Sequence, residues 1–158
     1  MVLVQDRLRC QHGQVALNAL TDEQLMQHAI ELAWSVRTTT APNPWVGAAL
    51  LADDGTVHVG ATQPPGGAHA EIGALAAAGS DAAGATLATT LEPCCHAGRT
   101  GPCTAAIIEA GVVRVLIGIE DPDKQVAGEG IKALRYAGID VVVGTLSAEV
   151  RAQLEPYL

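Results

Sequence analysis

From residue 85 onward, apolar β-rich runs alternate with segments of helical pattern. The runs at 85–91, 112–119 and 139–145 predict strands, because they are short and rich in β-branched residues. Helices are expected between them, at 102–111 and 130–138. Strands that alternate with helices in this way form a sheet that helices cover on both faces. The chain is therefore expected to adopt an α/β fold, a three-layer αβα sandwich.

The first half of the chain adds a hairpin and two helices to this prediction. Asp53-Asp54-Gly55 separates two β-rich runs and is typical of a tight turn, so these runs are expected to pair antiparallel. Thr21 can cap a helix, and Trp34 is expected on the buried face of that helix. The predicted elements are a helix at 21–37, strands at 45–52 and 56–61, a helix at 70–79 and a short closing helix from Ser147. The sheet should be mixed, with about five strands.

Length and charge narrow the class of protein. The 158 residues suit one domain, expected at 21–158 after a loosely patterned lead-in at 1–20. No run approaches the roughly 20 apolar residues of a membrane span, and no signal peptide is evident, so we expect a cytoplasmic protein.

The net charge is −8 and aromatic residues make up 3% of the chain. Nucleic-acid binding needs basic clusters and stacking rings, so a small-molecule partner is expected instead.

Cysteine residues crowd into one short segment. Cys94, Cys95 and Cys103 lie close together in the sequence, beside His96. In a chain without a secretory signal, this crowding indicates a metal site in a reducing compartment rather than disulfides. Cys94 and Cys103 each follow a proline where a helix is predicted to begin. The dipole at such a helix N-terminus favours the thiolate form that binds metal.

The segment His69-Ala70-Glu71, at the start of another predicted helix, supplies the remaining groups. The imidazole of His69 and the thiolates of Cys94 and Cys103 make three ligands for Zn²⁺. A structural zinc site closes with a fourth protein ligand, whereas a catalytic one leaves that position to water. Glu71 is the natural group to take a proton from that water and pass it on.

This pattern of H-x-E, then P-C, then a later cysteine is the established signature of zinc-dependent nucleobase deaminases. The spacing here is P-C-x₈-C rather than the common P-C-x-x-C. Cys95 and His96 are the alternative candidates for a fourth zinc ligand, and His96 could instead line the site.

Longer motifs carry a resemblance to one family within this class. They are PNPWVGA (42–48), HAEIGAL (69–75), TLEPCCHAGRTGPC (90–103), AIIEAG (106–111) and DPDKQVAGEG (121–130). Together they resemble the deaminase domain of the bifunctional riboflavin-biosynthesis deaminase/reductase. The resemblance implies a cytidine deaminase-like fold and a zinc-dependent hydrolase. Its implied reaction converts 2,5-diamino-6-ribosylamino-4(3H)-pyrimidinone 5′-phosphate into the 5-amino-6-ribosylaminouracil phosphate and ammonia.

The resemblance also implies substrate-binding residues. Asn43 matches a position that contacts substrate, and Arg99 matches a basic position associated with the ribose phosphate. Asp121 and Asp123 fall on the loop that recognises the ribosylpyrimidine. The sequence ends soon after the resemblance does, without a reductase domain, so either a separate reductase chain is expected or the sequence is a fragment. A homo-oligomer is expected by analogy with small deaminases of this fold.

Three other functions compete with this interpretation. A related zinc deaminase could act on another small pyrimidine or purine, because Thr62 and Asp123 replace residues that are common in the family. An RNA- or DNA-editing deaminase is disfavoured by the acidic charge and the scarcity of aromatic residues. A non-catalytic zinc module would leave Glu71 without a use beside the metal.

Overall fold

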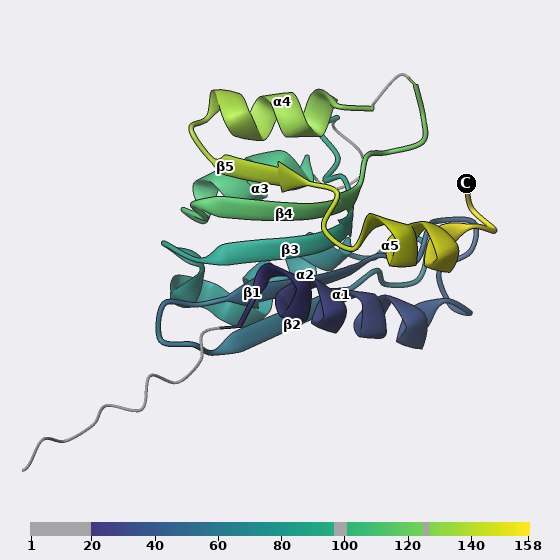
Figure 1. The fold of residues 1–158 in the computed structure, drawn as a ribbon, viewed down its shortest axis with the longest axis horizontal. Coiled ribbons are helices and arrows are strands. Elements are labelled where there is room, and N and C mark those ends of the chain that lie inside the picture. The colour runs from purple at the N-terminus through teal and green to yellow at the C-terminus, as the bar shows by residue number, and fades with distance from the viewer. Residues whose placement is uncertain (1–19, 97–100, 125–126) are drawn as a thin grey trace, which may run out of the picture.

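The structure is a computed structural model that describes residues 20–96, 101–124 and 127–158. Its centre is a five-stranded sheet of order β2-β1-β3-β4-β5, in which β1 is antiparallel to both neighbours and β3, β4 and β5 are parallel (Figure 1). The strands are β1 (Gly47–Leu51), β2 (Val57–Ala61), β3 (Thr86–Leu91), β4 (Arg114–Ile119) and β5 (Asp140–Val143). The helices are α1 (Asp22–Val36), α2 (Ala70–Ala78), α3 (Cys103–Glu109), α4 (Glu129–Tyr136) and α5 (Ser147–Leu154), with a 3₁₀ helix η1 (Gly79–Ala82). The predicted α/β class and mixed sheet are confirmed.

Two glycines on neighbouring strands show that helices cover both faces of the sheet. Gly47 of β1 pairs with Ala61, the residue after Gly60 of β2, so the two glycines face opposite sides. A Cβ atom on Gly47 would lie 1.9 Å from the carbonyl oxygen of Ala29 in α1. A Cβ atom on Gly60 would lie 2.2 Å from the carbonyl oxygen of Ala70 in α2. Hence α1 and α2 pack on opposite faces of the sheet. The helix α5 lies beside α1 on one face, and α3 and α4 follow α2 on the other (Figure 1).

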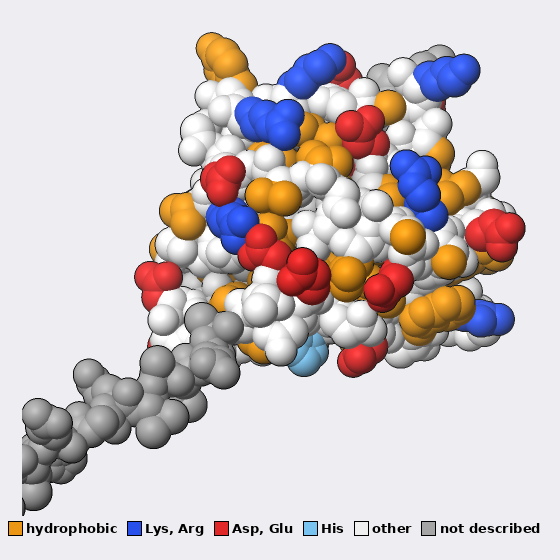
Figure 2. All heavy atoms as spheres, in the orientation of Figure 1, with side chains coloured by type: hydrophobic (Ala, Val, Ile, Leu, Met, Phe, Trp, Pro, Cys, Tyr) orange, Lys and Arg blue, Asp and Glu red, His pale blue; other side chains and the backbone are white. Residues whose placement is uncertain are grey.

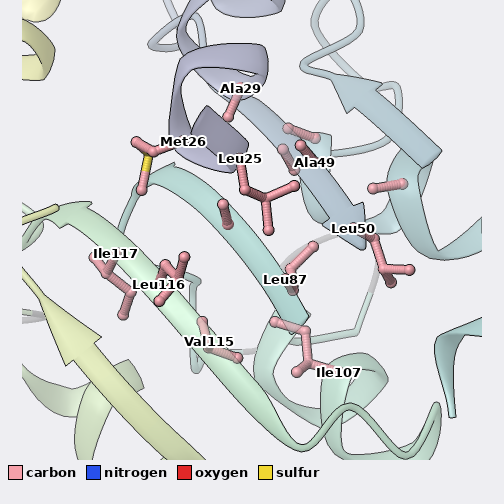
Figure 3. Close-up of a cluster of buried hydrophobic side chains, with 14 of the residues drawn as sticks. Leu25, Met26, Ala29, Ala49, Leu50, Leu87, Ile107, Val115, Leu116 and Ile117 are labelled. Carbon is pink, nitrogen blue, oxygen red and sulfur yellow. The ribbon is translucent and has the colours of Figure 1, made fainter. Parts of the chain in front are cut away.

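The core lies between the helices and the central strands. Leu25 and Met26 of α1 pack over the sheet, and Ile107 of α3 belongs to the same buried cluster (Figure 3). The capping box that begins α1 is formed by Thr21 and Gln24, as the sequence led us to expect at Thr21.

The prediction that Trp34 is buried was wrong, because its side chain is 44% exposed. The buried stripe of α1 consists of Leu25, Met26, Ala29, Ile30 and Ala33. Trp34 lies just past the edge of this stripe, and the guanidinium of Arg37 lies 5.2 Å from its ring centre. The side chain of Gln153 in α5 donates a hydrogen bond to the carbonyl of Ile30, so contact with α5 helps to set which face of α1 is buried.

An ion-pair network ties the first turn of α1 to the sheet. Arg114 of β4 donates from Nη1 and Nη2 to the two carboxylate oxygens of Asp22, at 2.6 and 2.8 Å, and from Nε to Asp140 at 3.1 Å. Such a two-pronged contact is the strongest arrangement of an ion pair, although these side chains are partly exposed to solvent.

We therefore expect Asp22→Asn to reduce the free energy of unfolding by about 1 kcal/mol, which corresponds to about 2–4 °C in Tm. Calorimetry checks this value. Glu23→Gln is the matched control, because it removes a charge from the same helical turn without touching Arg114. An equal loss in the control would assign the effect to the helix N-terminus rather than to the ion pair.

The surface carries mixed charges. On the face that bears α1 and α5, the basic and acidic side chains are interspersed rather than gathered into a basic stripe (Figure 2). Among the described residues, no helix combines the length and the apolar character needed to cross a bilayer.

Candidate metal centre and active site

Loops from four strands converge at one edge of the sheet. The parallel neighbours β3 and β4 end there. Because β1 runs antiparallel to β3, β1 begins at this edge, and β2 ends at it. Outside the strand ends lies a cavity of about 350 Å³, a size that suits a small molecule. Its lining includes six residues singled out in the sequence: Asn43, His69, Glu71, Cys94, Asp121 and Asp123.

Three side chains of metal-binding type lie close together, and two of them, His69 and Cys94, line the cavity. His69 immediately precedes α2, Cys94 follows β3, and Cys103 is the first residue of α3. The His69 Nδ1 atom lies 3.6 Å from the Cys94 sulfur and 3.3 Å from the Cys103 sulfur, and the three donor atoms lie within 4.8 Å of one another. Donor atoms around a tetrahedral zinc ion are about 3.5–4 Å apart, so the two distances from His69 and the chemistry of this donor set suit Zn²⁺.

One detail of the predicted metal site was wrong. Cys103 does begin a helix, but Cys94 lies in the loop after β3 and not in a helix. The electrostatic consequence still holds, because the backbone N–H of Cys103 donates to the Cys94 sulfur at 3.3 Å. The first amide of α3 thus stabilises a thiolate that belongs to the other cysteine.

The two thiols differ in acidity. The hydrogen bond from the Cys103 side chain, helped by His69 and by the Cys103 amide, lowers the pKa of Cys94 to about 4 although burial opposes it. The same contact raises the pKa of Cys103, because losing its proton would place a second negative sulfur beside the first. Without a cation, the pair therefore favours a thiolate at Cys94 and a thiol at Cys103. This excess of negative charge favours a metal ion between the sulfurs.

Glu71 lies beside this donor set. It is the second residue of α2, one helical position past Ala70, and its side chain is buried, with 4% exposed. Burial raises the pKa of its carboxyl, although the positive field of His69 and the backbone act in the opposite direction. A carboxyl group whose pKa is raised in this way holds a proton more readily, which suits it to taking up a proton and giving it back.

The remaining predicted residues lie on two sides of the cavity. Asn43 precedes β1 and is exposed, whereas Asp121 and Asp123 follow β4. The Asp121 carboxylate accepts a hydrogen bond from the backbone N–H of Asp123 at 2.9 Å, and burial raises the pKa of Asp121. Arg99, predicted to contact a phosphate, lies outside the described residues.

The alternative ligands do not join the metal-binding group. Within the described residues, the cluster of donor atoms contains neither Cys95 nor His96, and His96 instead lines the cavity. Trp45 lies in the sequence between Pro44 and Val46, which line the cavity, but it packs against the hydrophobic core.

Three further polar residues of the cavity lining, Thr62, Glu92 and Tyr157, were not among the predicted site residues. The Thr62 hydroxyl makes two hydrogen bonds with the backbone of Val46: it accepts one from the N–H group at 3.0 Å and donates one to the carbonyl oxygen at 3.3 Å. Glu92 lines the cavity with a buried carboxylate, and its place before Pro-Cys was the signal that could have found it. Tyr157 reaches the cavity from the segment after α5, and no motif in the sequence indicates this.

A comparison with known protein families agrees with this geometry. Residues 20–119 match the family described as the cytidine and deoxycytidylate deaminase zinc-binding region. The chain belongs to this zinc-binding deaminase family. Zn²⁺ is the metal that this family binds, and the cluster of His69, Cys94 and Cys103 supplies donor atoms suited to it.

Individual deaminase-family relatives are also similar over most of the chain. The riboflavin biosynthesis protein RibD of Corynebacterium ammoniagenes is 53% identical over 137 residues, which cover 86% of this chain and 40% of that protein. RibD of Escherichia coli (strain K12) is 48% identical over 139 residues, which cover 88% of this chain and 38% of that protein. The chain thus spans about two fifths of the length of these relatives.

Solved structures confirm the deaminase fold. Acinetobacter baumannii RibD, form 2, superposes with a TM-score of 0.84 at 41% identity and covers 87% of this chain and 39% of that one. A Thermotoga maritima protein named diaminohydroxyphosphoribosylaminopyrimidine deaminase/5-amino-6-(5-phosphoribosylamino)uracil reductase gives a TM-score of 0.77 at 41% identity and covers 84% of this chain and 39% of that one. The predicted cytidine deaminase-like architecture is therefore confirmed.

Proposed function

We propose that this chain catalyses the zinc-dependent hydrolytic deamination of 2,5-diamino-6-ribosylamino-4(3H)-pyrimidinone 5′-phosphate in riboflavin biosynthesis. The products are the 5-amino-6-ribosylaminouracil phosphate and ammonia. The observation that carries the proposal is a buried carboxyl group, Glu71, in the same cavity as two members of a three-donor zinc site. The similarity to proteins named RibD supports this choice of substrate.

In this proposal, His69, Cys94 and Cys103 hold the metal. The arrangement of their donor atoms supports three protein ligands, and a tetrahedral ion held by them would have one position left for solvent. When bound there, Zn²⁺ supplies the Lewis acidity that makes water a nucleophile at neutral pH.

Glu71 moves the protons of the reaction. Its carboxylate takes a proton from the attacking water and delivers it to the ring nitrogen next to the carbon that bears the exocyclic amine. It then takes the second proton from the hydroxyl group now on the ring carbon and passes it to the departing amine, so that a C=O bond replaces the C–N bond and ammonia leaves. The raised pKa of the buried carboxyl suits both the uptake and the delivery of the proton.

Asn43, Asp121 and Asp123 bind the substrate in this scheme, with hydrogen bonds to the pyrimidine and to the ribose hydroxyl groups. Arg99 binds the phosphate, a role that rests on the match to the family motif. The product has a carbonyl-rich ring and an unreduced ribosyl group. The name of the Thermotoga relative supports a reductase, in a partner chain or in a further part of the protein, as its consumer.

The leading alternative is deamination of another, uncharged pyrimidine or purine. Three carboxylates besides Glu71 line the cavity, those of Glu92, Asp121 and Asp123, and no lysine or arginine is among the described lining residues. This acidic lining would repel a phosphate that is not neutralised by a basic group.

Ammonia release decides between the two candidates. With the proposed phosphate and its dephosphorylated form as substrates, we expect kcat/KM to favour the phosphate by about tenfold or more, the effect of one charge-assisted contact. Arg99→Gln should remove this preference, whereas Arg151→Gln, a change at an exposed residue of α5, should preserve it. Equal turnover of the two compounds, or faster turnover of a free nucleoside or base, would favour the alternative.

A further inference from the structure

Glu92 is a buried acid that the proposed chemistry does not use. It directly follows β3, two positions before Cys94, and only 5% of it is exposed. Its carboxylate accepts three backbone hydrogen bonds, all from the segment that follows β4. Oε2 accepts from the N–H groups of Asp121 at 3.0 Å and Gly128 at 2.9 Å, and Oε1 accepts from that of Ile131 at 3.2 Å.

These three amides lie at both ends of the loop between β4 and α4. Asp121 is near its beginning, Gly128 immediately precedes α4, and Ile131 is in the first turn of that helix. The amides of a first helical turn lack partners within their own helix, and a carboxylate satisfies them with charge-assisted hydrogen bonds. One side chain just after β3 therefore holds both ends of the loop and caps α4 from outside the helix.

The backbone beside Glu92 is pressed against the same helix. A Cβ atom on Gly130 would lie 2.1 Å from the carbonyl oxygen of Pro93 and 3.1 Å from the Oε1 atom of Glu92. The first clash is with backbone, which cannot turn away, so only glycine allows this approach. The segment that leads to Cys94 and the first turn of α4 thus form one packed unit.

We propose that Glu92 is a positioning residue that sets the substrate-binding loop against the metal-binding loop. The chain of contacts runs from Glu92 to the Asp121 amide, and from the Asp121 carboxylate to the Asp123 amide. It fixes two proposed substrate-binding residues relative to Cys94, which is two residues from Glu92. The carboxylate can accept roughly four hydrogen bonds, and backbone amides already supply three of them. Its main contacts are therefore with the backbone and not with the substrate. This inference rests on the proposed function for its kinetic consequence but not for its structural one.

Glu92→Gln tests the proposal with little change of shape. One carboxylate oxygen becomes an NH₂ group, which must face at least one of the three N–H donors and cannot accept from it. We expect KM to rise about tenfold or more, kcat to change by less than about threefold, and the zinc content to stay the same. Amide hydrogen exchange at Asp121, Gly128 and Ile131 should become about tenfold faster. Glu109→Gln, at an exposed position of α3, is the control and should alter none of these quantities.

The outcomes separate the possible roles of Glu92. A higher KM with unchanged exchange at the three amides would mean that Glu92 contacts the substrate directly, which overturns the proposal. Faster exchange with an unchanged KM also overturns it, since the loop would then have no role in binding. If the wild-type chain turns over none of the tested substrates, the proposed function fails, and the exchange rates alone decide whether Glu92 holds the loop.

A second variant approaches the same contact from the other side. Gly130→Ala keeps Glu92 and its charge but drives the first turn of α4 away from Pro93. It should raise KM and speed exchange at Asp121 and Gly128, as Glu92→Gln does. If Glu92→Gln does not fold, a folded Gly130→Ala protein with wild-type KM overturns the proposal.

Discussion

Replacing Glu71 with glutamine should lower kcat by about 10²–10⁴-fold while zinc stays bound, because a general acid–base group contributes about that much to a rate. Glutamine keeps the size and most of the hydrogen-bonding capacity of the buried side chain, but it cannot take or give a proton. The donor atoms of His69, Cys94 and Cys103 are unchanged, so the metal site should persist.

Zinc per chain and steady-state ammonia release measure the two halves of this prediction. Glu23→Gln is the matched control, because Glu23 is also the second residue of a helix, α1, but is exposed and distant in sequence from the site. It should leave kcat at the wild-type value. Retention of activity by the Glu71 variant would refute the role proposed for this carboxyl, and loss of zinc with the activity would make that role structural.

Replacing Cys94 with serine should remove zinc from the isolated protein and lower kcat/KM by more than about 100-fold, the upper range for loss of a group that merely supports a ligand. A hydroxyl group is a poor substitute for a thiolate at a zinc ion, since its proton is held much more tightly. The fold should survive, because the serine hydroxyl can still accept the hydrogen bond that the Cys103 amide gives to the Cys94 sulfur.

The adjacent residue supplies the control for this variant. Cys95→Ser makes the same chemical change one residue away, at a thiol outside the donor cluster. We expect it to keep a full complement of zinc, measured by elemental analysis after dialysis against a weak chelator. Zinc loss from the Cys95 variant, with retention by the Cys94 variant, would exchange the proposed roles of the two thiols.

Much of the fold could be predicted because its signals are local. The capped start of α1, the hairpin turn at Asp53-Asp54-Gly55 and the alternation after residue 85 each depend on neighbouring residues, and each prediction is confirmed. Trp34 was misplaced for the opposite reason. Its helix has a wide apolar stripe, and the part that is buried depends on packing against the sheet and on contact with α5, more than a hundred residues away in the sequence.

The candidate site divides in the same way. The clustering of His69, Cys94 and Cys103, with Glu71 in the same region, could be predicted because a metal requires certain atoms and the motifs that supply them are compact. Glu92 and Tyr157 were missed, because what each contacts is decided by how separate strands and the last helix meet. The place of Glu92 before Pro-Cys could have marked it as a site residue, but its partners are backbone amides, which look the same in every sequence.

The convergence of four strand-end loops at one edge of the sheet has an evolutionary consequence. The proposed hydrolytic groups lie on the connections after β2 and β3. Apart from Arg99, which the sequence also places after β3, the proposed recognition groups lie before β1 and after β4. Mutations in the second pair of connections can retune which nucleobase is accepted without disturbing the reaction itself. Glu92 links the two pairs of connections, so a change at this residue would affect both. Proteins of this family that differ in substrate should therefore differ in the residues around Glu92 but retain Glu92 itself.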